Sequence, residues 1–349
     1  NFSNDSNFDV KVAVTAQHRQ MLDQVIDFFD IKVDFDLNIM KHNQTLHQLT
    51  SDLIERITTD ILLTDSFDYV FVQGDTTTVL AASLAAFYQK IKVVHIEAGL
   101  RSHDMHSPFP EEMNRVLTSK LAYYHFCPTV VSKINLKNEN ITKNVFVVGN
   151  TVIDALLMGL EKIKKTDESK FLNQFKAIDF SKKIVLVTCH RRENFGKPFE
   201  EICEALLEIA NAHSETVEIV YPVHLNPNVK EIAHQKLIAA NIHLITPLDY
   251  PELIWMMNKS YMILTDSGGI QEEAPSLGKP VLVLREVTER REGVDAGTAI
   301  LVGSDKSKIV SETLKLIENK SYYSSISNSS NPYGDGTTCE QIKGILKNY

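Results

Sequence analysis

A short segment with the sequence Asp-Ser-Gly-Gly, at residues 266–269, follows the apolar run 261–265 and precedes a predicted helix that carries Glu272 and Glu273. This order places free backbone N–H groups and the positive end of a helix dipole at the carboxyl end of a strand. Because glycine lets a ligand approach the backbone closely, the segment predicts a phosphate-binding site. Either glutamate can then accept hydrogen bonds from a ribose. The alternative is a structural turn in which Asp266 or Ser267 caps the helix.

Three acidic residues in the first half of the chain also lie at the ends of predicted strands or at the start of a predicted helix. Asp75 follows the predicted strand 69–73, Glu97 ends the run 92–97, and Glu111 stands near the start of a predicted helix. Since neighbouring parallel strands bring their carboxyl ends together, we expect the three carboxylates to converge. Such groups tune one another's pKa and can leave one as a proton acceptor near neutral pH. Any one of them alone is better explained as a helix cap, whereas all three together favour acid–base chemistry.

The second half contains a cationic segment, His190-Arg191-Arg192, directly after the predicted strand 183–188. A histidine and two arginines at a strand's end predict an anion site that binds a diphosphate and supports its departure as a leaving group. The alternative is a structural histidine with one arginine paired to a glutamate. His224 lies in a further polar loop, after the strand 217–221.

The composition limits the class of protein. With 349 residues, 43% of them hydrophobic, the chain can form two ordinary cores, and it contains no apolar run of membrane-spanning length. The net charge of −9 and the dispersed basic residues predict neither a nucleic-acid nor a membrane partner. The amino-terminal residues do not form a secretory signal. The four cysteines, Cys127, Cys189, Cys203 and Cys339, lack metal-ligand spacing, which predicts a reduced, cytoplasmic protein without structural zinc or disulfides.

Short apolar runs alternate with helical patterns along the whole chain, which predicts an α/β protein with parallel sheets covered by helices. The polar stretch 161–181 separates two series of such units and is the expected domain crossing. We therefore predict one domain at residues 1–165 plus a returning helix at 338–349, and a second at 166–337. The predicted strands are 10–15, 69–73, 92–97, 145–148, 183–188, 217–221, 242–245, 261–265 and 280–284.

Taken together, these motifs, from Thr-Ala-Gln-His-Arg at 15–19 to Asn-Pro-Tyr-Gly-Asp-Gly at 331–336, resemble the bacterial non-hydrolysing UDP-N-acetylglucosamine 2-epimerases. The resemblance covers essentially the whole chain. It implies two Rossmann-like domains in a GT-B arrangement, an active site in the interdomain cleft, and a homodimer. It also implies reversible conversion of UDP-GlcNAc to UDP-ManNAc through elimination of UDP, a 2-acetamidoglucal intermediate and re-addition, without a cofactor or metal. The product would supply ManNAc for a bacterial surface polysaccharide.

The resemblance also implies roles for individual residues. The acid–base candidates are Asp75, Glu97 and Glu111, with His190 near the diphosphate, and which carboxylate takes the C2 proton stays open. The implied substrate-binding residues are Arg115, Ser267, Gly268, Gly269, Glu272 and Arg290, with the Ser-Gly-Gly segment at the diphosphate and Glu272 at the ribose. The implied residues of a second, activating UDP-GlcNAc site are Gln17, Gln20, Arg191 and His224.

The chain departs from the family pattern in several places. The family's opening strand, Gly-Thr-Arg-Pro-Glu loop and helix are not in the sequence, and we expect the native protein to contain them. Leu253 stands where the family often has an aromatic residue near the uracil, Arg291 replaces a usual proline, and Cys189 replaces a common glycine. We interpret Cys189 as a packing residue and not as a nucleophile.

Three other functions are alternatives to the epimerase reading. A hydrolysing 2-epimerase would release ManNAc and UDP through the same glycal. A GT-B glycosyltransferase would share the glycine loop but would not require the three carboxylates. A nucleotide-sugar sensor would bind without turnover.

Overall fold

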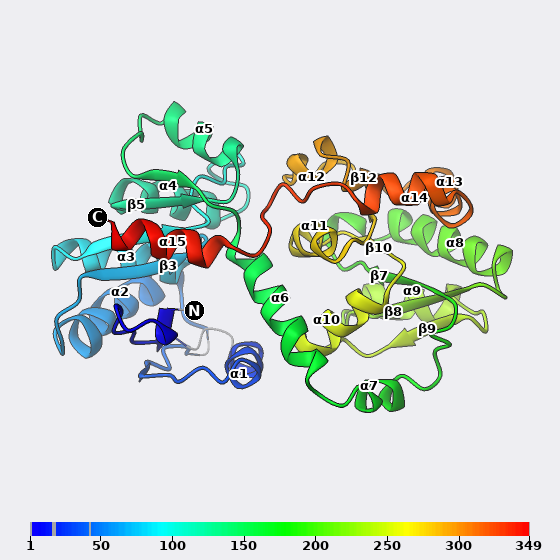
Figure 1. The fold of residues 1–349 in the computed structure, drawn as a ribbon, viewed down its shortest axis with the longest axis horizontal. Helices are drawn as coiled ribbons and strands as arrows, with labels where there is room; N and C mark the ends of the chain where they lie inside the picture. Colours follow the sequence, from blue (N-terminus) through cyan, green and yellow to red (C-terminus); the bar gives the residue numbers. More distant parts are fainter. Residues whose placement is uncertain (1, 16–18, 42, 349) are drawn as a thin grey trace. The chain divides into compact units, whose positions relative to one another are not determined.

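The computed structural model describes residues 2–15, 19–41 and 43–348, which form two compact units (Figure 1). The first comprises Asn1–Asp154 with Gly334–Tyr349, and the second comprises Ala155–Tyr333. The boundary between these units lies inside helix α6 (Thr151–Lys164), and a domain boundary after residue 165 stays a prediction. Asp154, in the first turn of α6, accepts backbone N–H groups from Thr338 and Cys339 of the returning segment, at 3.3 and 2.8 Å.

The first unit contains a parallel sheet in the order β3-β4-β5-β6. Its middle strands are buried on both faces, as the apolar runs predict, with Val93, Val94, Tyr124 and Phe126 almost fully excluded from solvent. The strands are β3 (Tyr69–Gln73), β4 (Lys92–Ile96), β5 (Tyr124–Cys127) and β6 (Val145–Val147), and β1 (Ala13–Val14) pairs with β2 (Phe35–Asp36) in a separate parallel pair.

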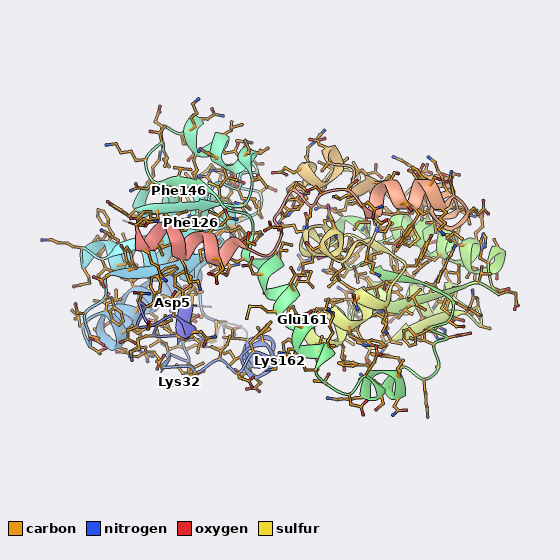
Figure 2. All side chains as sticks on the ribbon, in the orientation of Figure 1. Asp5, Lys32, Phe126, Phe146, Glu161 and Lys162 are labelled. Carbon is orange, nitrogen blue, oxygen red and sulfur yellow. The ribbon has the colours of Figure 1, made fainter. Side chains whose placement is uncertain are left out.

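Helices connect the strands of this unit and cover its sheet. One of these helices, α3 (Thr77–Tyr88), is rich in small residues. Its alanines Ala81, Ala85 and Ala86 are fully buried, so neighbouring elements can pack closely against it. Helix α15 (Thr338–Lys347) packs Ile342 and Leu346 into the aromatic cluster that contains Phe126 and Phe146, which Figure 2 labels. The other helices are α1 (Arg19–Phe28), α2 (Leu46–Ile57), α3 (Thr77–Tyr88), α4 (Glu111–Leu121) and α5 (Val130–Asn138), with a π-helical turn at Thr58–Leu62.

The second unit is a six-stranded parallel sheet in the order β12-β11-β10-β7-β8-β9. Chain order therefore reverses between β7 and β10, the doubly wound pattern in which ligands bind at the carboxyl ends of the two central strands. The parallel α/β architecture predicted from sequence is thus confirmed in both units. The strands are β7 (Lys183–Thr188), β8 (Val217–Pro222), β9 (Ile242–Ile245), β10 (Met262–Thr265), β11 (Val281–Val283) and β12 (Ala299–Leu301).

The helices of this unit include α8 (Lys197–Ala212), which buries Phe199, Ile202, Leu206 and Ile209 in the core. The remaining helices are α7 (Ser169–Gln174), α9 (Pro227–Lys236), α10 (Tyr250–Lys259), α11 (Gly268–Glu273), α12 (Arg291–Asp295), α13 (Lys306–Glu318) and α14 (Lys320–Ser327), with 3₁₀ turns at Arg192–Asn194 and Ala274–Leu277. Within the described part of the chain, no helix has the length and apolar character needed to cross a membrane.

The single tryptophan, Trp255 on α10, anchors the segment that enters the second unit. Its ring stacks on Phe171 at 5.2 Å and on Phe175 at 5.7 Å between centroids. Its Nε1 donates a hydrogen bond to Glu168 Oε1 at 3.1 Å. The indole is 2% exposed, so this aromatic stack fixes α7 to the core.

Candidate functional site

The loops that follow β7 and β10 meet at the point where the sheet order reverses. Thr188 and Thr265 are register partners, and their hydroxyls are 2.6 Å apart. The next residue after β10, Asp266, is fully buried and accepts the backbone N–H groups of His190 and Arg191, each at 2.8 Å. The cationic segment and the glycine segment predicted from sequence therefore lie side by side.

Asn194 and Arg285 extend this junction to the loop after β11. The buried Asn194 side chain donates to Asp266 Oδ2 at 3.0 Å and to the Leu284 carbonyl at 3.1 Å. Arg285 donates to Glu193 at 2.5 Å and to Glu289 at 2.6 Å. Three loops at the carboxyl edge of the sheet are thus held by a continuous set of polar contacts, which the sequence motifs alone do not indicate.

The glycine segment is covered on one side by Arg290. A Cβ built on Gly268 would lie 3.2 Å from Arg290 Cζ, so the guanidinium rests against the bare α-carbon. Arg290 Nε donates to Glu272 Oε1 at 2.8 Å, and the Glu272 side chain is nearly buried. Glu272 therefore holds the arginine that faces Gly268.

Glu273 occupies a different position from its neighbour. A Cβ built on Gly269 would lie 3.7 Å from Glu273 Oε2, so this carboxylate stands beside the glycine segment. Burial, and secondarily the charge of Glu272, raises the pKa of Glu273 to about 7. The resemblance implies Glu272 as the ribose residue, whereas the carboxylate that lies next to Gly269 is that of Glu273.

His190 and His224 come together on the exposed side of the second unit. Their rings stack with centroids 5.7 Å apart and planes 14° from parallel. They follow the paired strands β7 and β8, and His224 Nδ1 accepts the Asn226 backbone N–H at 3.1 Å. Of the remaining predicted activating-site residues, Gln17 lies outside the described residues, and Gln20 belongs to α1, where its side chain is not described.

The first unit contains an acidic site at the carboxyl ends of β3 and β4. Asp75 forms an ion pair with Arg115 Nη2, and Arg115 Nη1 lies 3.2 Å from Glu112. The Asn114 side chain donates to the Asp75 carbonyl at 2.9 Å. Glu111 begins α4, the helix that supplies both Asn114 and Arg115.

Glu97 lies beside Gly74, the residue that precedes Asp75. A Cβ on Gly74 would lie 3.7 Å from Glu97 Oε2, and Gly74 has φ +77°. His95, a buried residue one place from the end of β4, lies with Nε2 2.8 Å from the Gly74 carbonyl. Burial lowers the pKa of His95 to about 4, so its ring is neutral and Nε2 donates this hydrogen bond. Of the predicted residues, Asp75 and Arg115 are thus paired, and Glu97 lies beside the residue that precedes Asp75.

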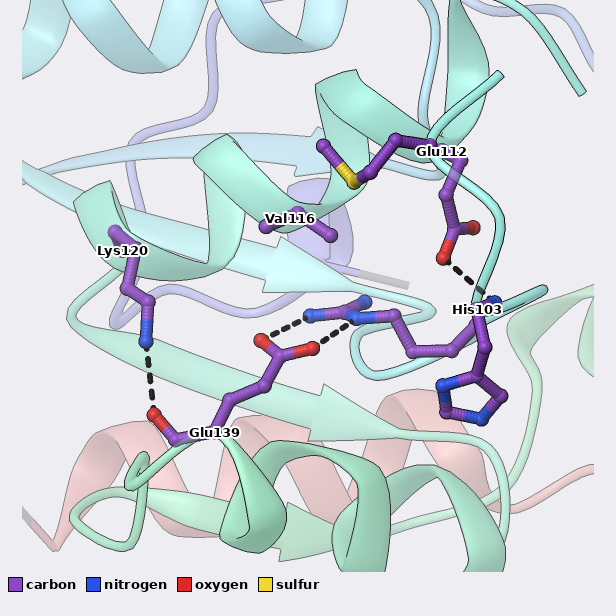
Figure 3. Close-up of a pocket in the computed structure, with 7 residues that line it drawn as sticks. His103, Glu112, Val116, Lys120 and Glu139 are labelled. Atoms are coloured by element: carbon purple, nitrogen blue, oxygen red, sulfur yellow. Dashed lines mark hydrogen bonds and ion pairs between the residues drawn. The ribbon is translucent and has the colours of Figure 1, made fainter. Parts of the chain in front are cut away.

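A pocket of about 320 Å³ opens in the first unit (Figure 3) and shares Glu112 with the acidic site. The carboxylates on its wall are bound to protein groups: Glu112 accepts the N–H groups of Ser102 and His103 at 3.0 and 3.1 Å, and Glu139 accepts two hydrogen bonds from Arg101 at 2.6 and 2.9 Å. These bonds fix the loop that follows β4. The pocket is lined by Arg101, His103, Met105, Glu112, Val116, Lys120 and Glu139.

Cys189 packs under the junction of the two central loops. It is 2% exposed, and burial, followed by the charge of Asp266, raises its thiol pKa well above the usual value. A thiol of this kind is a poor nucleophile, in agreement with a packing role. Over residues 2–15, 19–41 and 43–348, no group of three or more His, Cys, Asp or Glu side chains is arranged to hold a metal ion.

Comparison with known proteins identifies the family. The family model described as UDP-N-acetylglucosamine 2-epimerase matches residues 1–347. The chain belongs to this family. The UDP-N-acetylglucosamine 2-epimerase of Escherichia coli K12 is 53% identical over 348 residues, which cover 99% of this chain and 92% of the relative. The resemblance inferred from the motifs is confirmed, and membership in this epimerase family places the protein among the isomerases.

Solved structures of the family match along both units. The Neisseria meningitidis UDP-GlcNAc 2-epimerase, crystallised with UDP-GlcNAc, is 50% identical with a TM-score of 0.89, covering 100% of this chain and 94% of that one. The Methanocaldococcus jannaschii UDP-GlcNAc 2-epimerase, in complex with UDP-GlcNAc and UDP, is 36% identical with a TM-score of 0.78 and covers 98% and 93%.

Proposed function

We propose that this protein interconverts UDP-GlcNAc and UDP-ManNAc by inverting C2 of the sugar. The observation that carries the proposal is the junction at the β7/β10 switch point, where the glycine segment, Arg290 and His190 share one anion-binding edge. The chain combines this edge with a carboxylate cluster in the other unit, and it is 50% identical to a relative crystallised with UDP-GlcNAc.

The proposed chemistry is an elimination followed by re-addition. A carboxylate removes the C2 proton while the C1–O bond breaks, and the bonding electrons leave with UDP. The C2–H electrons form the C1=C2 double bond of 2-acetamidoglucal. UDP then adds back at C1 while a proton reaches C2 from the opposite face. The base and the acid come from Asp75, Glu97 and Glu111, and Arg115 holds Asp75 in place.

The second unit is proposed to bind the nucleotide. His190 and Arg290 offset the charge that develops on the diphosphate, and Glu273 takes the ribose hydroxyls, because Glu272 is engaged with Arg290. The diphosphate-binding residues are Ser267, Gly268 and Gly269.

We also propose that UDP-GlcNAc activates the enzyme at a second site formed by Gln17, Gln20, Arg191 and His224. The stacking of His224 on His190 supports this proposal, because a ligand that orders one ring also orders the other. The product would supply ManNAc for a bacterial surface polysaccharide, and free cysteines are consistent with the proposed cytoplasmic setting.

A homodimer is the proposed assembly. Exposed apolar side chains on α3 and α4 support it, because Met113 and Leu117 lie one turn apart on α4, and α3 packs beside α4. The exposed residues at the end of α3 are Phe87 and Tyr88, which are 54% and 64% exposed and would be covered in a dimer. Sedimentation of the protein and of Leu117→Glu tests this proposal, since a monomeric wild type would contradict it.

The central test is turnover in deuterated water. The protein is incubated with UDP-GlcNAc in D2O, and the products are followed by NMR. The proposal predicts deuterium at C2 of both UDP-GlcNAc and UDP-ManNAc, with no free sugar. Release of free ManNAc would indicate a hydrolysing enzyme. Absence of exchange would contradict the proposed function and leave a transferase or a sensor.

A further inference from the structure

The two carboxylate oxygens of Asp266 have different surroundings. Oδ2 accepts three hydrogen bonds, from the backbone N–H groups of His190 and Arg191 and from the Asn194 side chain, at 2.8, 2.8 and 3.0 Å. Oδ1 is buried and accepts no hydrogen bond from the described residues. It lies 3.4 Å from Nδ1 of the His190 ring.

A buried carboxylate oxygen without a hydrogen bond is uncommon and indicates a functional constraint. The contacts of Oδ2 already hold the loop that follows β7, so the need to hold this loop does not explain the position of Oδ1. The 3.4 Å separation exceeds a good hydrogen bond, but such contacts shorten when substrate binds. Oδ1 is therefore placed to accept a hydrogen bond from Nδ1–H.

The rest of the His190 ring is arranged to face a ligand. Its side chain is 46% exposed, in contrast to the fully buried Asp266, so the ring bridges the scaffold and the open edge of the site. His224 stacks against one ring face and restricts its rotation. With Nδ1 directed at Asp266, Nε2 on the opposite side of the imidazole is the nitrogen left to contact substrate.

We propose that Asp266 is a positioning residue for His190. It holds the backbone of the loop through Oδ2 and selects the Nδ1–H tautomer through Oδ1, so that Nε2 is presented to the substrate diphosphate. In the complex Nε2 takes up a proton from solvent, so that the imidazolium, balanced by Asp266, donates Nε2–H to the diphosphate oxygen that receives the electron pair when the C1–O bond breaks. The inference rests on the proposed function, in which His190 contacts the diphosphate.

A double-mutant cycle separates positioning from anchoring. Asp266→Asn should reduce the rate of C2 exchange by about 10- to 100-fold, the usual effect of losing a carboxylate that orients a functional histidine. In the His190→Gln background, the same substitution should cost less than about 2-fold, because its effect passes through the imidazole. UDP affinity should change less than turnover. Equal losses in both backgrounds would show that Asp266 only anchors the loop, and would overturn the inference.

Tyr221→Phe is the matched control. The buried Tyr221 hydroxyl donates to the Cys189 carbonyl at 2.7 Å, so the variant loses a hydrogen bond that anchors the same loop while Asp266 and His190 are kept. We expect lower stability but the same coupling between Asp266 and His190.

A second measurement does not require that the Asp266 variant fold. Nitrogen-15 NMR of the wild-type imidazoles, assigned with His190→Gln, should show His190 in the Nδ1–H tautomer. Observation of the Nε2–H tautomer would overturn the inference. If the wild type shows no C2 exchange, the proposed function is contradicted. If it shows exchange but the Asp266 and His190 substitutions have independent effects, only the role of Asp266 is contradicted.

Discussion

The Glu97 carboxylate lies against the bare α-carbon of Gly74, where an added Cβ would be 3.7 Å from Oε2. Glu97 has φ +64°, a conformation that costs a residue with a side chain about 1–3 kcal/mol. Such strain persists where the surroundings enforce it, and it clusters at functional sites. The strained backbone thus directs Glu97 toward the turn that carries Asp75, which favours a shared chemical role for the two acids.

Asp75→Asn and Glu97→Gln should each reduce C2 exchange by about 10²-fold or more, because each change removes a group able to transfer a proton. UDP binding should be largely kept, because the nucleotide is assigned to the other unit. The measurement is exchange in D2O, with titration of UDP in parallel. Glu55→Gln, on the exposed face of α2, is the control and should exchange normally. Near-normal rates in both site variants would remove these acids from the mechanism.

Glu273 should make stability depend on pH. Its pKa is raised to about 7 in the folded protein, against 4.5 for the ordinary carboxyl. Between these values the folded state binds a proton that the unfolded chain has released. The stabilising contribution is therefore complete below about pH 4.5 and is lost as the pH rises through about 7.

Urea unfolding of wild type and Glu273→Gln at several pH values between 4.5 and 8 measures this effect. The variant should lose less stability over that interval, since glutamine does not titrate. Parallel curves for the two proteins would show that Glu273 does not titrate in this window.

Glu273 and Glu272 should differ in how they recognise the ribose. At pH 8, above the pKa of Glu273, loss of hydrogen bonds to the charged acceptor costs about 1.5–3 kcal/mol, so Glu273→Gln should weaken UDP binding by about 10- to 100-fold. It should also abolish the preference for UDP over 2′-deoxy-UDP. Glu272→Gln removes the partner of Arg290 and should weaken both ligands equally. Titration calorimetry with UDP and 2′-deoxy-UDP measures this difference. If the Glu272 variant, and not the Glu273 variant, loses the preference for UDP, then Glu272 is the ribose-binding residue.

Two glycines in the first unit should respond oppositely to alanine. Gly99 has φ +90°, and a Cβ there would lie 2.2 Å from the Ser132 carbonyl oxygen. Gly99→Ala should therefore lower the free energy of unfolding by about 2 kcal/mol or more. Gly344, in α15, has nothing within 4 Å of its added Cβ, and Gly344→Ala should raise stability by about 0.5–1 kcal/mol. Denaturant titration measures the free energy of unfolding of both variants. Changes of the same sign in the two variants would contradict the prediction.

Asp154 should control the stability of α15. Its buried carboxylate accepts two backbone N–H groups at the start of that helix, and Asp154→Ala leaves them without a partner. We expect a cost of about 1–3 kcal/mol and faster amide exchange in α15. Asp9→Ala removes an acid that is 87% exposed and should leave this exchange unchanged. Unaltered protection in the Asp154 variant would show that the helix is held by its apolar face alone.

The sequence predicts most of the doubly buried strands, because their apolar runs leave few alternatives. It does not indicate β5, whose four buried residues Tyr-His-Phe-Cys include a polar histidine and do not form an apolar run. It also does not indicate β2 or β12, which contain two and three residues. The sequence also does not indicate the contacts of Asp154 with Thr338 and Cys339, since these residues lie far along the chain.

For the site, the motifs identify the loops but not the orientation of neighbouring side chains. Glu272 and Glu273 are equivalent in a sequence pattern, and only packing shows that one pairs with Arg290 while the other stands beside Gly269. Asp266 reads equally well as a helix cap, and its contacts to His190 depend on the register of β7 and β10. The sequence therefore predicts which loops form the site. It does not predict which side chains contact one another there, because those contacts depend on the register of strands far apart in the chain.

The aromatic stack around Trp255 has a practical consequence. Because this is the single indole in the chain, tryptophan emission originates from one place within Ala155–Tyr333. Fluorescence melting curves will therefore report that unit alone, while circular dichroism averages over the entire molecule. Any gap between the two midpoints measures how independently the halves unfold.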